Sequence, residues 1–351
     1  MVFFLVMVNT TIAAQFNYLF MSIYLLEIFV SFVLLATVPL GVYTLMGMSK
    51  FHRNIRLSAS SVIIHLALAI LARFVLLYYQ INRMPMRLSD FVFLTANLVR
   101  EAVAGWSIAI PIVFSAERSF ATIFSSWYEK QSPATLIVFV VQSLILEAYG
   151  WTNALFLIYE VYSIQFNVVA YAAVFFGGAV LFQNVLMLNV EYGKRLQKMS
   201  IITAYCLSRS YQIRENIKIM QVIRKLAFPA LIFSIPAFIL ISMHIFLPCE
   251  ERLSLVRNVS IALFDLWIAL YAAFFQLLAY NIEPRLQESV RRWFYAAYCL
   301  DKYDAMTGRI RKMTRMSSPP HLNETDVYFT MLSKDLQSTK KQSTISKISI
   351  I

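Results

Sequence analysis

Charged residues are scarce in this chain of 351 residues, and the scarcity excludes an ordinary soluble protein. Asp, Glu, Lys and Arg together make up 14% of the sequence, whereas hydrophobic residues make up 59%. Soluble domains carry about 25% charged residues. Acidic residues are the rarer kind, with 19 Asp and Glu against 31 Lys and Arg, which leaves a net charge of +12. Most of the apolar surface must therefore meet something other than water.

The residues that build catalytic, metal and cofactor sites are also few. Eight Gly occur in the whole chain, and none of them forms the glycine-rich loop that binds phosphate groups. The four histidines fall in a loop, two different apolar segments and the C-terminal tail, without the spacing of metal ligands: His52, His65, His244 and His321. We therefore expect no catalytic residues, no bound metal, no cofactor and no enzymatic activity.

What the sequence has in abundance is long apolar runs. A hydrocarbon core of about 30 Å needs ~20 apolar helical residues, and a backbone in lipid must satisfy its own hydrogen bonds as a helix. Seven runs meet that length: Ser22–Met48, Ala59–Ile81, Phe91–Glu117, Ala134–Ile158, Phe166–Val190, Leu226–Leu247 and Asn258–Asn281. The sequence predicts an all-α membrane protein built as a bundle of seven transmembrane helices.

The basic residues predict how this bundle is oriented. If the N-terminus lies outside, the cytoplasmic segments hold 25 of the 31 Lys and Arg and the outer segments hold four. Cytoplasmic loops retain Lys and Arg, so we expect the N-terminus outside and the C-terminus in the cytoplasm. The positive charge then lies beside the inner leaflet, where anionic lipid is its expected partner. Nucleic acid, another common partner of basic chains, is not expected.

The same topology divides the chain into four parts. Residues 1–21 form an extracellular N-terminus and residues 22–283 form the bundle. An amphipathic interfacial helix is predicted over 284–300, and a disordered cytoplasmic tail rich in Ser, Thr and Lys over 301–351.

Two residues in these flanking parts are candidate modification sites. Asn9 begins an Asn-Thr-Thr glycosylation sequon in the extracellular segment, although such sequons also occur by chance. Cys299 ends the amphipathic segment, where it is either palmitoylated or an unmodified thiol. The other cysteines are Cys206 and Cys249, and only Cys249 lies in an outer segment, which excludes an extracellular disulfide within the chain.

An acid and a base stand next to each other where the third run leaves the membrane, at Glu117 and Arg118. Such a pair can hold the Arg in one orientation and release it when the helices move, which makes it a candidate two-state switch. The alternative is that Arg118 extends to the membrane interface, as basic residues at helix ends often do.

Two motifs carry a resemblance to a known family. Glu117-Arg118-x-Phe120-Ala121-Thr122 followed by Tyr128-Glu129 resembles the third-span signature of nematode serpentine chemoreceptors of the Sra superfamily, and most of all the Sre (class epsilon) family. The stretch Leu207–Ile217 is similar to the "LS-x-x-YQ-x-x-EN" segment of the same family's third cytoplasmic loop.

The resemblance implies a GPCR-like chemosensory receptor that detects a small molecule and signals through a heterotrimeric G protein. It also implies a place in the plasma membrane, in the cilium of a sensory neuron. Residues that the resemblance places at the activation switch or the G-protein surface are Glu117, Arg118, Tyr128, Glu129, Tyr211, Gln212, Glu215 and Asn216. The chain departs from better-known receptors at Ser119, where Tyr is usual, and it has no Cys at the outer end of the third span.

Ionisable residues inside apolar runs are costly and mark function by default. They are Arg73 in the second run, Arg100 and Glu101 in the third, Glu147 in the fourth and Asp265 in the seventh. Arg73, Arg100 and Asp265 lie at similar depth, about 10–15 Å from the outer surface at ~1.5 Å per residue. We hypothesise a polar ligand pocket in which both Arg, partly neutralised by Asp265 and Glu101, bind an acidic ligand group. The alternative is a set of internal salt bridges that fixes the helix packing.

Other features of the runs bear on mechanism. Trp106 lies below Arg100 and forms either the floor of the pocket or part of the helix packing. Pro111, Pro229 and Pro236 predict kinks in the third and sixth helices. A ligand-gated channel or a transporter is the alternative function, but the sequence shows neither duplicated halves nor a ring-forming acidic stripe.

Overall fold

The structure is a computed structural model, and it describes residues 7–47, 53–87, 89–124, 133–199, 207–248, 250–282, 287–288 and 290–291. The side chains of residues 133–135, 196–199, 207–215 and 218 are not part of this description. Tyr128, Glu129 and Cys299 therefore lie outside the described residues, as do the side chains of Tyr211, Gln212 and Glu215. The same holds for the tail and for most of the predicted amphipathic helix.

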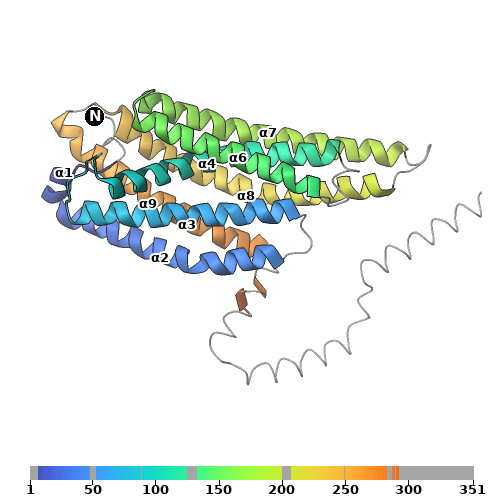
Figure 1. Ribbon diagram of the computed structural model, residues 1–351, viewed down its shortest axis with the longest axis horizontal. Helices are drawn as coiled ribbons and strands as arrows, with labels where there is room; N and C mark the ends of the chain where they lie inside the picture. The colour runs from blue at the N-terminus through green and yellow to red at the C-terminus, as the bar shows by residue number, and fades with distance from the viewer. Residues whose placement is uncertain are drawn as a thin grey trace, which may run out of the picture. The chain divides into compact units, whose positions relative to one another are not determined.

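Seven long helices run alongside one another in the described part of the chain (Figure 1). All seven are long and apolar enough to cross a membrane. They are α2 (Asn17–Gly47), α3 (Arg53–Ile81), α4 (Phe91–Ile123), α6 (Pro133–Ile158), α7 (Ile164–Met199), α8 (Leu207–Phe246) and α9 (Glu251–Ile282). A short helix, α1 (Thr10–Gln15), precedes them. The predicted bundle of seven membrane-spanning helices is confirmed, and the chain is a multi-pass membrane protein.

The helices extend beyond the predicted spans, mostly at one end of the bundle. Helix α7 continues nine residues past Val190, and α8 begins 19 residues before Leu226. A helix satisfies its own backbone hydrogen bonds, so it can continue into water after its apolar residues end. We call the end of the bundle that carries α1 the outer end and the opposite end the cytoplasmic end, following the orientation that the basic residues predict.

Helix α4 lies at the centre of the bundle and packs against α3, α6 and α7. Its contact with α6 is so close that a Cβ atom added to Gly150 would lie 2.5 Å from the carbonyl oxygen of Ala102. Glycine therefore allows these two helices to approach each other. Pro111 lies inside α4, and Pro229 and Pro236 lie inside α8. Kinks at these prolines remain a prediction.

Helix α4 begins at a well-formed cap outside the membrane-spanning segment. One carboxylate oxygen of Asp90 accepts hydrogen bonds from the backbone N–H groups of Val92 and Phe93, and the Tyr79 hydroxyl donates to the other at 2.6 Å. The Tyr79 hydroxyl, together with these N–H groups, lowers the pKa of Asp90 below its ordinary value. The cap thus holds the beginning of α4 against the end of α3.

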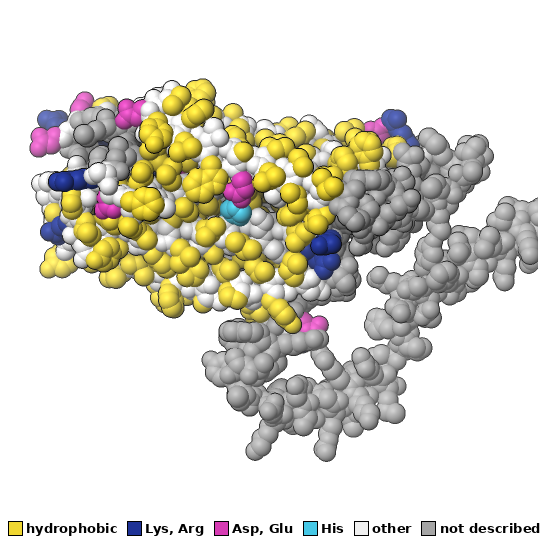
Figure 2. Space-filling view, viewed as in Figure 1, with side chains coloured by type: hydrophobic (Ala, Val, Ile, Leu, Met, Phe, Trp, Pro, Cys, Tyr) yellow, Lys and Arg dark blue, Asp and Glu magenta, His cyan; other side chains and the backbone are white. Residues whose placement is uncertain are grey.

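The outer surface of the bundle is predominantly hydrophobic. Large apolar side chains such as Phe29 and Leu188 are about two-thirds exposed, at 67% and 65%. Figure 2 shows hydrophobic side chains covering the middle of the visible face, with most of the visible Lys, Arg, Asp and Glu near its ends. Lipid tails, unlike water, can cover such a surface at no cost, which is consistent with seven membrane-spanning helices.

Candidate functional site

The outer end of the bundle is closed by the N-terminal segment. Met7 and Val8 are both 2% exposed and pack into the bundle, each against a different hydrophobic cluster. The backbone N–H of Asn9 donates to Asn258 Oδ1 at 2.7 Å, which ties this segment to α9. Asn9 itself is exposed and caps α1 by accepting from the N–H of Thr11. Its glycosylation stays a prediction.

A buried cluster of charged side chains lies beneath this segment. Arg73 on α3 donates from Nε to Glu27 Oε1 at 2.6 Å and from Nη2 to Glu27 Oε2 at 3.0 Å. Its Nη2 atom also lies 2.9 Å from Asp265 Oδ2 on α9. All three side chains are more than nine-tenths buried. Arg73 therefore links α2, α3 and α9 through a single guanidinium group.

Arg100 on α4 extends the cluster to a fourth helix. Its Nη2 atom donates to Glu101 at 2.8 Å, and its Nη1 atom lies 4.0 Å from Asp265 Oδ1. The structure thus brings together Arg73, Arg100, Glu101 and Asp265. The outer cluster, as we call these four residues with Glu27, contains three carboxylates and two guanidinium groups, a formal excess of one negative charge if all are ionised.

Glu27 was not among the residues predicted from the sequence, although it lies inside the first apolar run. A complete count of acidic residues within the runs would have found it, since it is the one charged residue in Ser22–Met48. Its partner could not be identified that way, because α2 is apolar around its whole circumference and shows no preferred face.

Several polar atoms near this cluster lack a hydrogen-bond partner among the described residues. They include Tyr24 Oη, Arg73 Nη1 and Gln80 Oε1, all buried. The Nε2 atom of Gln80 and the Nη1 atom of Arg100 both approach the sulfur of Met7, at 3.8 and 3.7 Å. Buried polar groups normally find a partner in protein, water or ligand. The outer cluster therefore offers donors and an acceptor that can bind a small polar molecule.

Trp106 and Glu147 lie away from the outer cluster. Trp106 packs with Ala109 and Leu146, and its ring stacks on that of His65 with centroids 4.0 Å apart. His65 Nε2 lies 2.5 Å from Glu147 Oε1, so these residues join α3, α4 and α6. In Figure 2 an acidic and a histidine side chain are visible together within the hydrophobic face. This arrangement favours the packing role that we considered for Trp106, and the pocket-floor role stays a prediction.

At the cytoplasmic end Arg118 is almost completely buried, with 1% of its surface exposed. Its Nε and Nη2 atoms both donate to the carboxylate of the adjacent Glu117. Its remaining terminal nitrogen, Nη1, donates to Asn216 Oδ1 on α8 at 2.8 Å. The charge is thus neutralised within α4, while a hydrogen bond to a neutral amide connects α4 to α8.

Two more polar side chains complete what we call the cytoplasmic lock, namely Glu117, Arg118, Thr122, Asn189 and Asn216. The hydroxyl of Thr122 donates to Asn189 Oδ1 on α7 at 2.6 Å. Asn216 Nδ2 approaches the same hydroxyl at 3.3 Å. Helices α4, α7 and α8 therefore meet at one buried polar network, which contains one Arg and one carboxylate.

The lock brings together residues of the two motifs that carry the family resemblance, one in α4 and one in α8. Asn216 follows Glu215 and stands five residues after Tyr211, and all of them belong to helix α8 rather than to a loop. Arg118 and Asn216 are 98 residues apart in the sequence. Asn189 was not identified from the sequence, because a single Asn near the end of an apolar run gives no local signal.

Comparison with known proteins agrees with this architecture. The sequence model of one family, described as Sre G protein-coupled chemoreceptor, matches residues 1–337. Serpentine receptor class epsilon-45 of Caenorhabditis elegans is 25% identical over 237 residues, which are 63% of this chain and 59% of that receptor. Class epsilon-8 of the same organism is 22% identical over 271 residues, 76% of each chain. Class epsilon-1 is 25% identical over 185 residues, 50% of this chain and 51% of the relative. The matched part thus spans less than two thirds of the first and third relatives.

Proposed function

We propose that this chain, which belongs to the family of Sre G protein-coupled chemoreceptors, is itself a chemosensory receptor that binds a small molecule and activates a heterotrimeric G protein. The observation that carries the proposal is the family match over residues 1–337 on a bundle with polar networks at both ends. We place the receptor in the plasma membrane of a sensory cilium, with its N-terminus outside.

The outer cluster is the proposed ligand site. Buried donors and acceptors with no hydrogen-bond partner in the described part of the chain, such as Arg73 Nη1 and Gln80 Oε1, supply the polar contacts. The sequence suggested an acidic ligand, but with Glu27 included each Arg already faces a carboxylate. The formal excess of one negative charge favours a neutral or cationic ligand over an anionic one. Entry of a ligand from the outer end requires displacement of Met7.

The cytoplasmic lock is the proposed activation switch. Opening a cleft between α4, α7 and α8 breaks hydrogen bonds to the neutral amides of Asn189 and Asn216, worth about 1 kcal/mol each for those of Thr122 and about 1.5–3 kcal/mol for that of the charged Arg118. Arg118 keeps its charge partner, Glu117, because both belong to α4. Once α8 moves, the nitrogen that contacted Asn216 becomes available to a G protein. Tyr128, Glu129, Tyr211, Gln212 and Glu215 remain proposed contributors to that surface.

A second-messenger assay in a heterologous cell tests the proposal. Cells expressing the receptor are exposed to a panel of neutral, cationic and acidic odorants and secreted metabolites, beside cells with Arg118→Ala at matched surface level. We expect a wild-type response that this substitution reduces at least tenfold. A ligand response that survives Arg118→Ala would contradict the switch, and a ligand-evoked current without G proteins would establish a channel instead.

The Arg100→Met variant then separates a ligand contact from a packing role. The side chain of Arg100 is 13% exposed and pairs with Glu101 on its own helix at 2.8 Å, with Asp265 farther away at 4.0 Å, so its removal leaves the contacts of Arg73 in place. At normal surface expression we expect the ligand concentration for half-maximal response to change at least tenfold, rising for a neutral ligand that accepts a hydrogen bond from Arg100 and falling for a cationic ligand, because the variant leaves the cluster more negative. An unchanged response in this variant would place the ligand elsewhere.

A further inference from the structure

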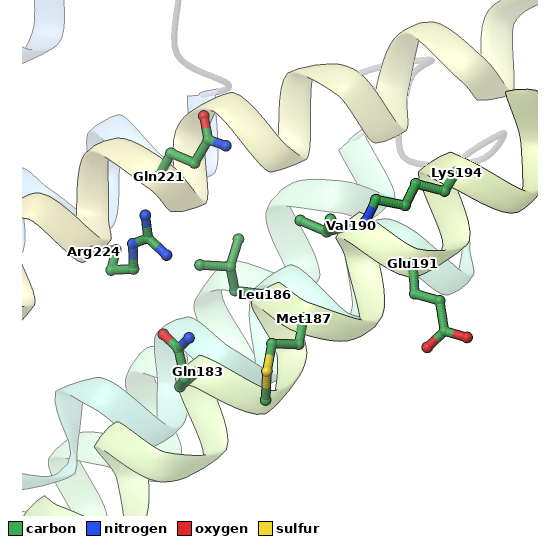
Figure 3. A pocket seen from close by; sticks show the side chains of 8 residues that line it. All are labelled: Gln183, Leu186, Met187, Val190, Glu191, Lys194, Gln221 and Arg224. Atoms are coloured by element: carbon green, nitrogen blue, oxygen red, sulfur yellow. The ribbon is translucent and has the colours of Figure 1, made fainter.

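A cavity of about 370 Å³ lies between α7 and α8 in the cytoplasmic half of the bundle, close to Asn189 of the cytoplasmic lock and distinct from the outer cluster (Figure 3). Its volume is within the range of small-molecule sites, roughly 300–1,000 Å³. Its lining combines an apolar floor with amide and charged side chains: Gln183, Leu186, Met187, Val190, Glu191, Lys194, Gln221 and Arg224. The mixture of apolar and cationic groups suggests an amphiphilic occupant.

The depth of this cavity places it at the boundary between lipid tails and lipid headgroups. A hydrocarbon core of about 30 Å corresponds to ~20 helical residues. Counted from the outer end of α7 at Ile164, that length ends near Gln183, and counted from the outer end of α8 at Phe246 it ends near Ala227. Arg224 thus lies about 5 Å beyond the hydrocarbon core, at the level of the phosphates of the inner leaflet, whereas Lys194 lies about three turns past Gln183, on the cytoplasmic side of that level.

The charges of the cavity are not balanced within the described residues. Glu191, the carboxylate in the lining, accepts from Arg195 Nη2 at 2.5 Å and is therefore already paired. Figure 3 shows its carboxylate pointing away from α8, whereas Arg224 points from α8 toward α7. Lys194 and Arg224 make no ion pair with any described residue. Two cations on opposite walls therefore face a shared space without a counterion.

The apolar part of the lining matches a lipid rather than a soluble anion. Met187 is 53% exposed on the lipid-facing surface, and Leu186 closes the floor from the buried side. Gln183 and Gln221 are exposed on α7 and α8 and supply uncharged hydrogen-bond donors. Arg and Lys bind phosphate oxygens, Arg in a two-pronged geometry, while acyl chains cover methionine and leucine.

We propose that this groove between α7 and α8 binds the headgroup of an anionic phospholipid of the inner leaflet, with Arg224 on its phosphate and Lys194 on the cytoplasmic side of the headgroup. A lipid wedged between these helices would resist or assist the movement of α8, so the inner leaflet would bias the receptor. The proposal is independent of the ligand and the G protein, because lipid binding is measured without either.

Native mass spectrometry of the purified full-length protein tests this assignment. Detergent-solubilised wild type is titrated with dioleoylphosphatidylserine and, separately, with dioleoylphosphatidylcholine. We expect the serine lipid to bind at least tenfold more tightly. Lys194→Gln and Arg224→Gln should each weaken its binding about fivefold, the ~1 kcal/mol expected for one basic residue beside an anionic membrane surface, and the double substitution about 25-fold.

Lys225→Gln is the matched control, since Lys225 is exposed, adjoins Arg224 and does not line the cavity. It removes the same charge and should leave lipid binding within twofold of wild type. An equal loss in Lys225→Gln and Arg224→Gln would show diffuse attraction and overturn the proposal, as would equal binding of both lipids. Displacement of the lipid by an equimolar amount of soluble glycerophosphoserine would overturn it in favour of a free phosphate site. As a control for folding, the midpoint of thermal unfolding of each variant is measured in detergent and should equal that of wild type.

Discussion

The outer cluster and the cytoplasmic lock are both buried polar networks that connect helices, but they neutralise charge in different ways. In the outer cluster Arg73 lies on α3 while its carboxylate partners lie on α2 and α9. In the lock, Arg118 and Glu117 are neighbours on α4, and the connections to α7 and α8 use the amides of Asn189 and Asn216.

The difference determines which helices can separate. Moving α3 away from α2 or α9 would leave an ionised group buried without a partner, at a cost of about 3–5 kcal/mol. Moving α8 away from α4 leaves the Glu117–Arg118 ion pair intact and breaks two hydrogen bonds of Asn216. The one with Thr122 is worth about 1 kcal/mol and the one with Arg118 about 1.5–3 kcal/mol. The first network is suited to hold helices together, and the second is suited to open and close.

The largest expected effect comes from breaking the outer cluster. Arg73→Met removes the cation between Glu27 and Asp265 and leaves both carboxylates buried without it. We expect stability to fall by roughly 3–5 kcal/mol, seen as a much lower thermal midpoint in detergent and little receptor at the cell surface. The double variant Glu27→Gln/Arg73→Met should recover part of the loss. If Arg73→Met alone has the stability of wild type, Arg73 does not link the helices.

A smaller effect is expected from the lock. Asn216→Ala removes the contact between α8 and Arg118 without stranding a charge. The loss of about 1.5–3 kcal/mol should raise ligand-independent signalling at least about tenfold at unchanged surface level. Asn216→Asp keeps an acceptor for Arg118 and serves as the control, with basal signalling at or below wild type. If the Ala variant is instead poorly folded and silent, the lock is structural like the outer cluster.

The smallest effect concerns the cap of α4, which belongs to neither network and provides a reference. Asp90 has a lowered pKa, so its carboxylate contributes stability that is present above its unfolded pKa and is lost as pH falls through the folded value. Asp90→Asn keeps a capping oxygen but cannot titrate. We expect the difference in thermal midpoint between wild type and variant to be constant above about pH 5 and to shrink below about pH 4. A difference that does not change with pH would show that Tyr79 and the backbone do not favour the ionised form.

The sequence predicted the large features of this protein because they depend on local composition. Any run of ~20 apolar residues must be a helix in lipid, so the seven spans required no knowledge of their neighbours. The family likeness rested on residues close together in the chain, such as Glu117, Arg118 and Thr122, and the match over residues 1–337 agrees with it. The depth of Arg73, Arg100 and Asp265 likewise follows from a simple count of residues along each helix.

Tertiary structure decided which of these residues meet. Contacts between helices depend on the rotation of each helix about its own axis, and a helix that is apolar on all sides gives no sign of which face turns inward. The pairing of Glu27 with Arg73, and that of Asn216 with Arg118, depends on these rotations, so it could be identified only from the structure. The groove between α7 and α8 arises in the same way, because Lys194 and Arg224 line one groove only once these two helices pack side by side.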